Sequence, residues 1–170
     1  GETVLEKPSF KDSVDSKRCI IHLEGFYEHH HKLGQKFPFY IQDKEKDLIC
    51  LAGLYSLWNS PLSGEQLTTF TIVTCKADIL MTDIHNNPKL KEPRMPRILT
   101  ELEQEVWLGQ STSNDELMEL INKVDSSTPT TLQAHSVGPI RGTHASRNSP
   151  TAIDPVKYAV LESGEQLDLF

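Results

Sequence analysis

Residues 48–58 read LICLAGLYSLW and residues 67–75 read LTTFTIVTC, two apolar runs separated by a turn at 59–64. The second run is the clearest strand in the chain, because its alternating threonines mark one face. Gly53 interrupts the first run, which predicts a long or bent strand near a bulge. Strands joined by so short a turn pair in antiparallel fashion, so this stretch predicts an antiparallel sheet.

Shorter segments on both sides extend this pattern. Apolar and β-branched runs predict further strands at 18–23, 37–42 and 131–137. Helical spacing predicts helices at 7–14, 101–108 and 114–124, with Ser9 and Asn114 as N-caps. The segment 138–155 is rich in Gly, Ser, Asn and Pro and reads as loop. We therefore expect an α+β fold, a curved or barrel-like, mainly antiparallel sheet with a few flanking helices. Residues 1–160 would form one domain portion and 161–170 a flexible tail.

Composition narrows the class of protein. The chain has 170 residues, of which 37% are hydrophobic and 24% charged, enough apolar material for a packed core. No apolar run approaches the roughly 20 residues that a membrane-spanning helix needs, and no signal segment is recognisable. The three cysteines, Cys19, Cys50 and Cys75, are widely spaced, which favours a reducing compartment over a disulfide-bonded protein. We expect all three to be buried as small apolar side chains.

The charge is unevenly distributed. The net charge of −7 argues against indiscriminate binding to nucleic acid. However, Lys89, Lys91, Arg94 and Arg97 cluster in 85–97. The segment 138–148 adds Arg141 and Arg147 and has no acid. Either these two segments form one face that meets phosphate, or they are ordinary solvated loops.

The first candidate site is Glu28, which follows Gly25-Phe26-Tyr27. A carboxylate placed after aromatic residues at a strand end suits a general acid, although a surface glutamate on a hairpin gives the same pattern. The histidines at 29, 30 and 31 raise the question of a metal. On a strand only His29 and His31 share a face, and no further ligand stands at zinc-site spacing. We expect no metal and no cofactor.

The second candidate site is His85, which follows a short expected helix and precedes a basic loop. A histidine there could exchange protons near neutral pH while Arg94 holds a phosphate. The alternative is a histidine whose hydrogen bonds are purely structural.

Five stretches occur in an order and spacing typical of one family: ETVLEKPSF (2–10), RCIIHLEGFYE (18–28), LAGLY (51–55), TFTIVTCKA (69–77), and DIH (83–85) with RMPRIL (94–99). From about residue 2 to 148 the chain resembles the SOS-response-associated peptidase family. The resemblance implies an α+β fold around a barrel-like sheet. It also implies covalent capture of abasic sites in single-stranded DNA during replication and the SOS response. In that family an N-terminal cysteine, exposed by removal of the initiator methionine, condenses with the sugar aldehyde to a thiazolidine. The same cysteine is thought to release that methionine.

The resemblance also implies roles for individual residues. Glu28 and His85 would supply the acid and the base that move protons on the sugar oxygens and the imine. Arg94 would clamp a flanking phosphate, and Met95 and Pro96 would shape the wall where the DNA bends.

This chain departs from the family pattern at several points. His29, which we count among the DNA-binding candidates, stands where the family has tryptophan, and this weakens a stacking wall. The segment 86–93 is an insertion between His85 and Arg94. Lys89 and Lys91 in that insertion either enlarge the DNA contact or displace Arg94, and Arg147 would add a contact from the second basic segment. The chain starts at Gly1 without the nucleophilic cysteine, so we expect the family's N-terminal segment to precede it.

The last five residues are Gln166, Leu167, Asp168, Leu169 and Phe170. QLDLF resembles the pentapeptide by which bacterial proteins dock on the DNA polymerase sliding clamp, with the last two side chains filling an apolar pocket. The alternative is a chance amphipathic ending that packs on its own domain.

The leading hypothesis is therefore a cytoplasmic, nucleoid-associated sensor of abasic sites in single-stranded DNA, recruited through the tail to the sliding clamp. The main alternative is a non-catalytic module that binds DNA and the clamp. A peptidase acting on other proteins is the least favoured, because nothing in the sequence indicates a peptide-binding groove. Whether the chain is an enzyme depends on the N-terminal cysteine, and no membrane partner is expected.

Overall fold

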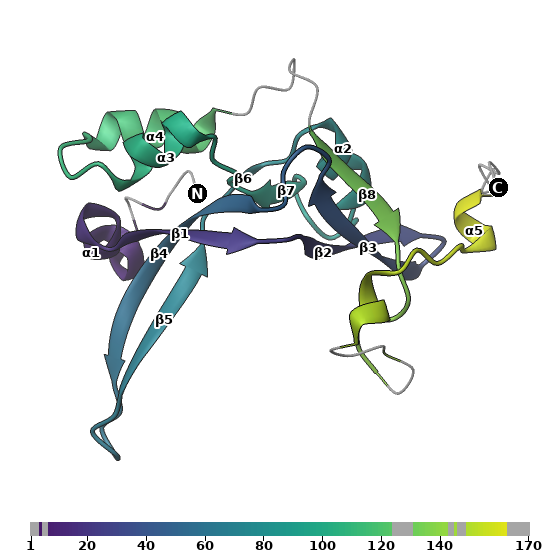
Figure 1. The fold of residues 1–170 in the computed structure, drawn as a ribbon, viewed down its shortest axis with the longest axis horizontal. Coiled ribbons are helices and arrows are strands. Elements are labelled where there is room, and N and C mark those ends of the chain that lie inside the picture. Colours follow the sequence, from purple (N-terminus) through teal and green to yellow (C-terminus); the bar gives the residue numbers. More distant parts are fainter. Residues whose placement is uncertain (1–3, 5–6, 124–130, 143–144, 146–148, 163–170) are drawn as a thin grey trace.

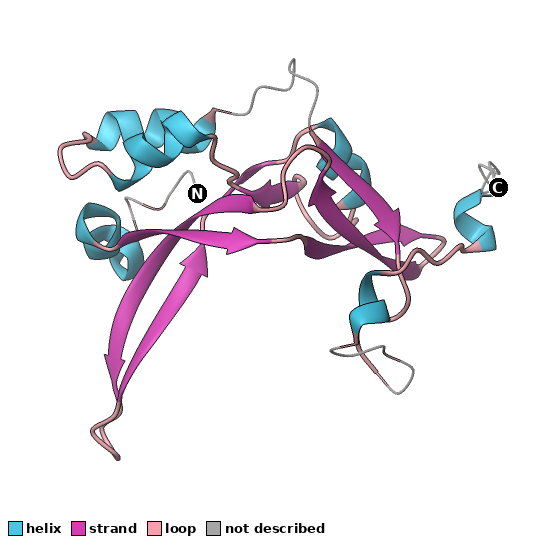
Figure 2. Ribbon diagram, in the orientation of Figure 1, coloured by secondary structure: helices cyan, strands magenta, loops and turns pink. Residues whose placement is uncertain are grey.

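The computed structural model describes residues 4, 7–123, 131–142, 145 and 149–162. Figure 1 shows the elements, and Figure 2 distinguishes helices from strands. The helical elements are α1 (Pro8–Ser16), α2 (Ile79–Ile84), α3 (Glu101–Leu108), α4 (Asn114–Asn122), the 3-10 turn η1 (Pro150–Ile153) and α5 (Ala159–Glu162). The strands are β1 (Arg18–Leu23), β2 (Phe26–Lys32), β3 (Gln35–Asp43), β4 (Ile49–Asn59), β5 (Gln66–Ile72), β6 (Thr74–Lys76), β7 (Arg94–Pro96) and β8 (Leu132–Ser136). None of the described helices is long and apolar enough to cross a membrane.

The strands form three antiparallel sheets, ordered β1-β4-β5, β2-β3-β8 and β6-β7. β1 runs almost straight into β2 and joins the first two sheets (Figure 1). An isolated antiparallel bridge between Leu51 and Ile98 connects the segment after β7 to β4. The α+β prediction is confirmed. The described strands do not close into a barrel, so the sheet that we expected as one curved unit is divided.

The expected strands are present, but several local details were wrong. The run 67–75 is not one strand, because its pairing partner changes at Val73 from β4 to β7. In addition, every residue of β5 is exposed. No bulge occurs at Gly53, where β1 and β4 stay in register. A Cβ there would come within 2.7 Å of Ile21 Cδ1, so the glycine permits close packing instead.

Helix starts also differ from the predicted caps. Lys7 is the N-cap of α1, which places Ser9 inside the helix. Ser113 caps α4, because its hydroxyl accepts from the Glu116 N–H while the Glu116 carboxylate accepts from the Ser113 N–H. This reciprocal capping box begins the helix at Asn114. The segment 138–155, expected as loop, contains the short turn η1.

A tight hairpin sets the register of β2 and β3. Leu33 and Gly34 connect the strands with φ of 51° and 73°. Positive φ at both central residues matches the turn whose twist suits paired strands, and glycine adopts it without strain. The resulting register pairs Glu28 with Phe39 and His31 with Lys36.

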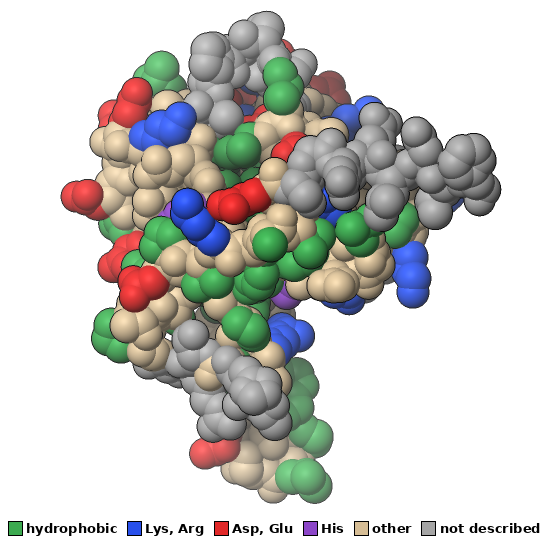
Figure 3. Space-filling view, turned by 90° about the vertical axis from the view of Figure 1, so that its right-hand side faces the viewer, with side chains coloured by type: hydrophobic (Ala, Val, Ile, Leu, Met, Phe, Trp, Pro, Cys, Tyr) green, Lys and Arg blue, Asp and Glu red, His purple; other side chains and the backbone are tan. Residues whose placement is uncertain are grey.

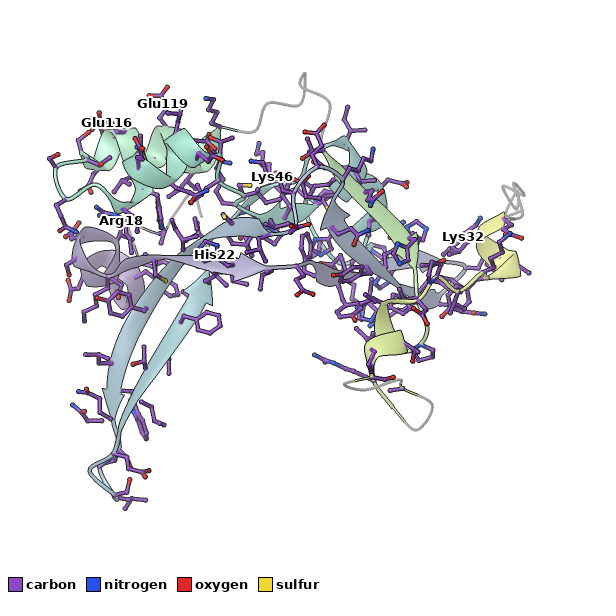
Figure 4. The ribbon with its side chains drawn as sticks, in the orientation of Figure 1. Arg18, His22, Lys32, Lys46, Glu116 and Glu119 are labelled. Atoms are coloured by element: carbon purple, nitrogen blue, oxygen red, sulfur yellow. The ribbon has the colours of Figure 1, made fainter. Side chains whose placement is uncertain are left out.

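The core has two parts. The first lies under α1, α3 and α4, where the fully buried Trp107 donates its indole N–H to the Cys19 carbonyl at 2.9 Å. Arg18 reinforces this region, since its guanidinium donates to the carbonyls of Trp107 and Gly109 at 2.5 Å (Figure 4). The second part packs α2 against β3, β4, β6 and β7, with Met81 and Ile84 buried. This second part supports the candidate site.

The β4–β5 hairpin extends away from both core parts, as the lower projection in Figures 1 and 3 shows. Its apolar side chains are exposed, with 65% of Phe70 and 48% of Leu57 accessible. The cysteines also differ from expectation, because only Cys75 is buried while Cys19 and Cys50 are half-buried. Partial burial nevertheless raises the pKa of the Cys19 thiol.

Candidate active site

The structure brings Glu28 and His85 together from distant parts of the chain. Glu28 Oε2 lies 3.7 Å from His85 Nδ1. Both side chains are partly buried, with 27% of Glu28 and 20% of His85 accessible. A carboxylate and an imidazole at this distance, each still reachable from solvent, form a pair that can exchange protons with a bound molecule.

Glu28 is held by its own strand. It lies in the middle of β2, and its Oε1 accepts a hydrogen bond from the His29 backbone N–H at 2.7 Å. This contact fixes one carboxylate oxygen and leaves the other beside His85. The side chain is thus oriented by backbone geometry rather than by a neighbouring cation.

His85 is held by the end of a helix. It is the C-cap of α2, and its backbone N–H donates to the Met81 carbonyl at 2.8 Å. Its Nδ1 lies 2.6 Å from the Arg94 carbonyl oxygen. A carbonyl can only accept, so Nδ1 carries a hydrogen, and Nε2 of the neutral ring is the nitrogen that can take up a proton.

Asn86, which sequence reasoning did not single out, joins this helix end to β2. Its Oδ1 accepts from the His31 N–H at 2.7 Å, and its Nδ2 donates to the His31 carbonyl at 3.0 Å. The side chain therefore pairs with the outer edge of β2 as a neighbouring strand would. His30 Nδ1 adds a contact of 3.0 Å to the Asp83 carbonyl. Together these bonds fix the distance between the strand of Glu28 and the helix of His85.

The pair lies in a cleft of about 320 Å³ at the outer edge of β2. Because successive side chains of a strand point to opposite faces, a cleft over an edge receives residues from both faces. The lining residues are Glu28, His29, His31, Lys36, His85, Asn87 and Arg141. The pKa of His31 is lowered by desolvation and by the nearby Lys36 charge.

The other described residues that are expected to contact DNA do not line this cleft with Glu28 and His85. The Arg94 guanidinium donates to the Thr74 carbonyl at 2.9 Å and lies 3.6 Å from Glu92. Met95 is only 8% accessible and packs in the second core part, beside the half-buried Pro96. Lys89 and Lys91 are exposed on the 86–93 loop and do not line the cleft.

The first basic segment does not form one continuous solvent-exposed face. Arg97 is 8% accessible, and its Nη2 donates to Glu103 Oε1 at 2.7 Å. Its Nε donates to the Leu120 carbonyl at 2.7 Å. Arg97 is therefore a structural cation that joins α3 and α4 to the segment after β7, and it is not available to phosphate.

Some expected residues lie outside the described part of the chain. These are Arg147 and the tail residues Gln166, Leu167, Asp168, Leu169 and Phe170. Among the residues that the structure does describe, no group of three or more His, Cys, Asp or Glu side chains is placed to hold a metal ion.

Comparison with known proteins finds relatives that share one family. The family model described as SOS response associated peptidase (SRAP) matches residues 1–140. Abasic site processing protein YoqW of Bacillus subtilis is 38% identical over 91% of this chain and 64% of its own length. Abasic site processing protein YobE of the same bacterium is 40% identical over 81% of this chain and 60% of its own. A crystal structure from Bacteroides thetaiotaomicron superposes with a TM-score of 0.77 at 32% identity, covering 92% of this chain and 64% of that one. The chain thus spans less than two thirds of the length of these relatives.

Proposed function

Because the chain belongs to the SOS response associated peptidase family, we propose that it processes abasic sites in single-stranded DNA. The observation that carries the proposal is the Glu28–His85 pair, 3.7 Å apart in an open cleft. The relatives named for abasic-site processing supply the substrate class, and the pair supplies the proton chemistry that such a substrate needs.

An abasic site in its ring-opened form presents an aldehyde. A primary amine adds to the aldehyde carbon, and loss of water then gives an imine. Glu28, as the acid, would protonate the departing oxygen. His85 Nε2, as the base, would take the proton that the amine releases. A thiol adjacent to that amine can next add across the C=N bond and close a five-membered thiazolidine ring.

In this proposal the amine and the thiol belong to one N-terminal cysteine, which is not among the 170 residues of this chain. In this proposal the chain would supply the cleft, the proton-transfer pair and the contacts that hold the DNA. Pro96, Lys89, Lys91 and Arg147 stay candidates for those contacts, while Arg94 would act mainly through its backbone carbonyl on His85.

The test is a crosslinking assay on the full-length protein. Single-stranded DNA with one abasic site is mixed with the protein, and a denaturing gel separates free from covalently bound DNA. A slower band that is lost when the N-terminal cysteine is replaced by alanine supports the proposal. Lack of a band from a protein with its initiator methionine removed would favour the alternative, a non-catalytic module that binds DNA and the clamp.

The QLDLF sequence favours recruitment to the bacterial sliding clamp as a separate, second function. Deletion of residues 166–170 is expected to abolish binding to the purified clamp, because Leu169 and Phe170 would fill its apolar pocket. Surface plasmon resonance on immobilised clamp measures this. Substitution of Glu165 by glutamine, just outside the motif, serves as the control and should leave binding intact. Undiminished binding by the truncated protein would contradict the hypothesis.

A further inference from the structure

We propose that Lys36 and Arg141 are the phosphate-binding pair of the cleft, holding the DNA backbone beside Glu28 and His85. This inference rests on the proposed function and assigns two residues outside the family motifs. Lys36 comes from β3, near the hairpin at which Lys32 ends β2 (Figure 4), and Arg141 follows β8.

The first argument is the charge lining the cleft. Lys36 and Arg141 are its two Lys or Arg side chains, and Glu28 is its single carboxylate. The net charge of this 170-residue chain is −7, so the cleft lining has the opposite balance of charge from the chain as a whole. A local cationic lining on an acidic protein favours a polyanion at that place and disfavours it elsewhere.

The second argument is that both cations are accessible and have no ion pair. Lys36 and Arg141 are exposed, and within the described part of the chain neither lies within 4 Å of a carboxylate oxygen. They can therefore bind phosphate without first giving up a protein partner. By contrast, the Arg94 guanidinium contacts Thr74 and Glu92, and Arg97 contacts Glu103.

The third argument is the position of Lys36 relative to the reacting pair. It faces His31 across the β2–β3 register, and its charge contributes to lowering the pKa of that histidine. His31 and His29 line the same cleft as Glu28. Lysine offers a point charge on a flexible stem, whereas arginine offers a planar fork that grips phosphate through two hydrogen bonds. The two side chains can thus hold a backbone that varies in conformation.

The test measures the salt dependence of DNA binding by the full-length protein. Fluorescence anisotropy follows binding to labelled single-stranded DNA without an abasic site, so chemistry does not intervene. Each cation that contacts a phosphate adds about 0.7 to the slope of log affinity against log salt for single strands. The double variant K36Q/R141Q is expected to bind more weakly and to lower that slope by about 1.4.

Two controls accompany the double variant. The substitution K46Q removes an exposed lysine that does not line the cleft, and it should leave the slope unchanged (Figure 4). The substitution R94Q tests the arginine of the family motif directly. Because the Arg94 guanidinium contacts Thr74 and Glu92, we expect the salt slope of this variant to equal that of the wild type. Urea unfolding of each variant verifies that the fold is retained.

The outcomes separate this inference from the function on which it rests. If the wild-type protein crosslinks abasic DNA but K36Q/R141Q keeps the full slope, the phosphate pair is wrong and the function stands. A slope lowered by R94Q and not by K36Q/R141Q would likewise overturn the pair in favour of Arg94. If the wild-type protein neither binds nor crosslinks the DNA, the proposed function fails and the inference fails with it.

Discussion

The substitution E28Q is expected to slow crosslinking to abasic DNA by a factor of about 10² to 10⁴, the contribution typical of one positioned general acid. Glutamine has the shape of glutamate and can still accept from the His29 N–H, so the geometry of the cleft is kept. What is lost is the carboxyl group beside His85, and with it the proposed proton transfer. Time courses on denaturing gels, with protein in excess over DNA, measure the single-turnover rate.

The matched control is E24Q, the same chemical change in an exposed glutamate outside the cleft. It should react at the wild-type rate. The salt slope of DNA binding should be unchanged in E28Q, because binding and chemistry use different residues in this arrangement. A wild-type rate in E28Q would remove Glu28 from the reaction, and equal slowing in E24Q would point to a non-specific effect of charge.

The choice of Glu28 and His85 as acid and base came from the resemblance and not from local pattern, and their proximity is seen only in the structure. Each residue alone reads equally well as a hairpin glutamate or a structural histidine. The contact depends on the hydrogen bonds of Asn86 to the His31 backbone, which fix α2 against β2. No periodic pattern in the sequence indicates that a side chain will hydrogen-bond to the edge of a strand. The role of Asn86 was therefore not predicted.

Lys36 and Arg141 were missed as a pair for a related reason. They are far apart in sequence, and only the antiparallel order β2-β3-β8 brings the segment after β8 to the same cleft as the β2–β3 hairpin. Arg141 was counted in a basic segment, but Lys36 lies just before the strand expected at 37–42 and in neither basic segment. Charge clustering along the chain is a weak guide when the site is assembled across strands.

The hydrophobic pattern predicted where the strands lie better than it predicted which strands pair with each other. The run 67–75 contains β5 and β6, but a change of pairing at Val73 leaves no mark in a continuous β-branched sequence. Arg97 shows a second limit of the sequence pattern. A basic residue close to Lys89, Lys91 and Arg94 is expected to be exposed to solvent, but Arg97 is buried. Its burial requires the counter-charge of Glu103, which the fold brings to it from α3.

That buried ion pair predicts the largest effect on stability. The substitution E103A is expected to lower the free energy of unfolding by about 3–5 kcal/mol, because it leaves the Arg97 charge buried without a carboxylate counter-charge. It also removes the capping box in which Glu103 accepts from the Thr100 N–H at 3.0 Å. Urea denaturation of the full-length protein, followed by circular dichroism, measures the change.

The same helix provides the control. Glu105 is exposed, and E105A makes the identical truncation where no buried cation depends on it. Such a surface change is expected to cost less than about 0.5 kcal/mol. If E103A and E105A unfolded at the same urea concentration, the Arg97–Glu103 pair would not be a major source of stability.

The ion pair also sets a pH dependence of known sign. Partial burial alone would raise the pKa of Glu103, but the hydrogen bond from Thr100 and the charge of Arg97 outweigh it and hold the pKa below its ordinary 4.5. The unfolded chain therefore binds a proton at a higher pH than the folded one, and stability falls as the pH drops. The contribution is complete above the unfolded pKa and is lost as the pH falls through the folded pKa. The stability difference between wild type and E103Q should thus be full at pH 7 and shrink below about pH 4.5, whereas E105Q should parallel wild type. A difference that stays constant across this range would show that Glu103 stabilises the fold without its charge.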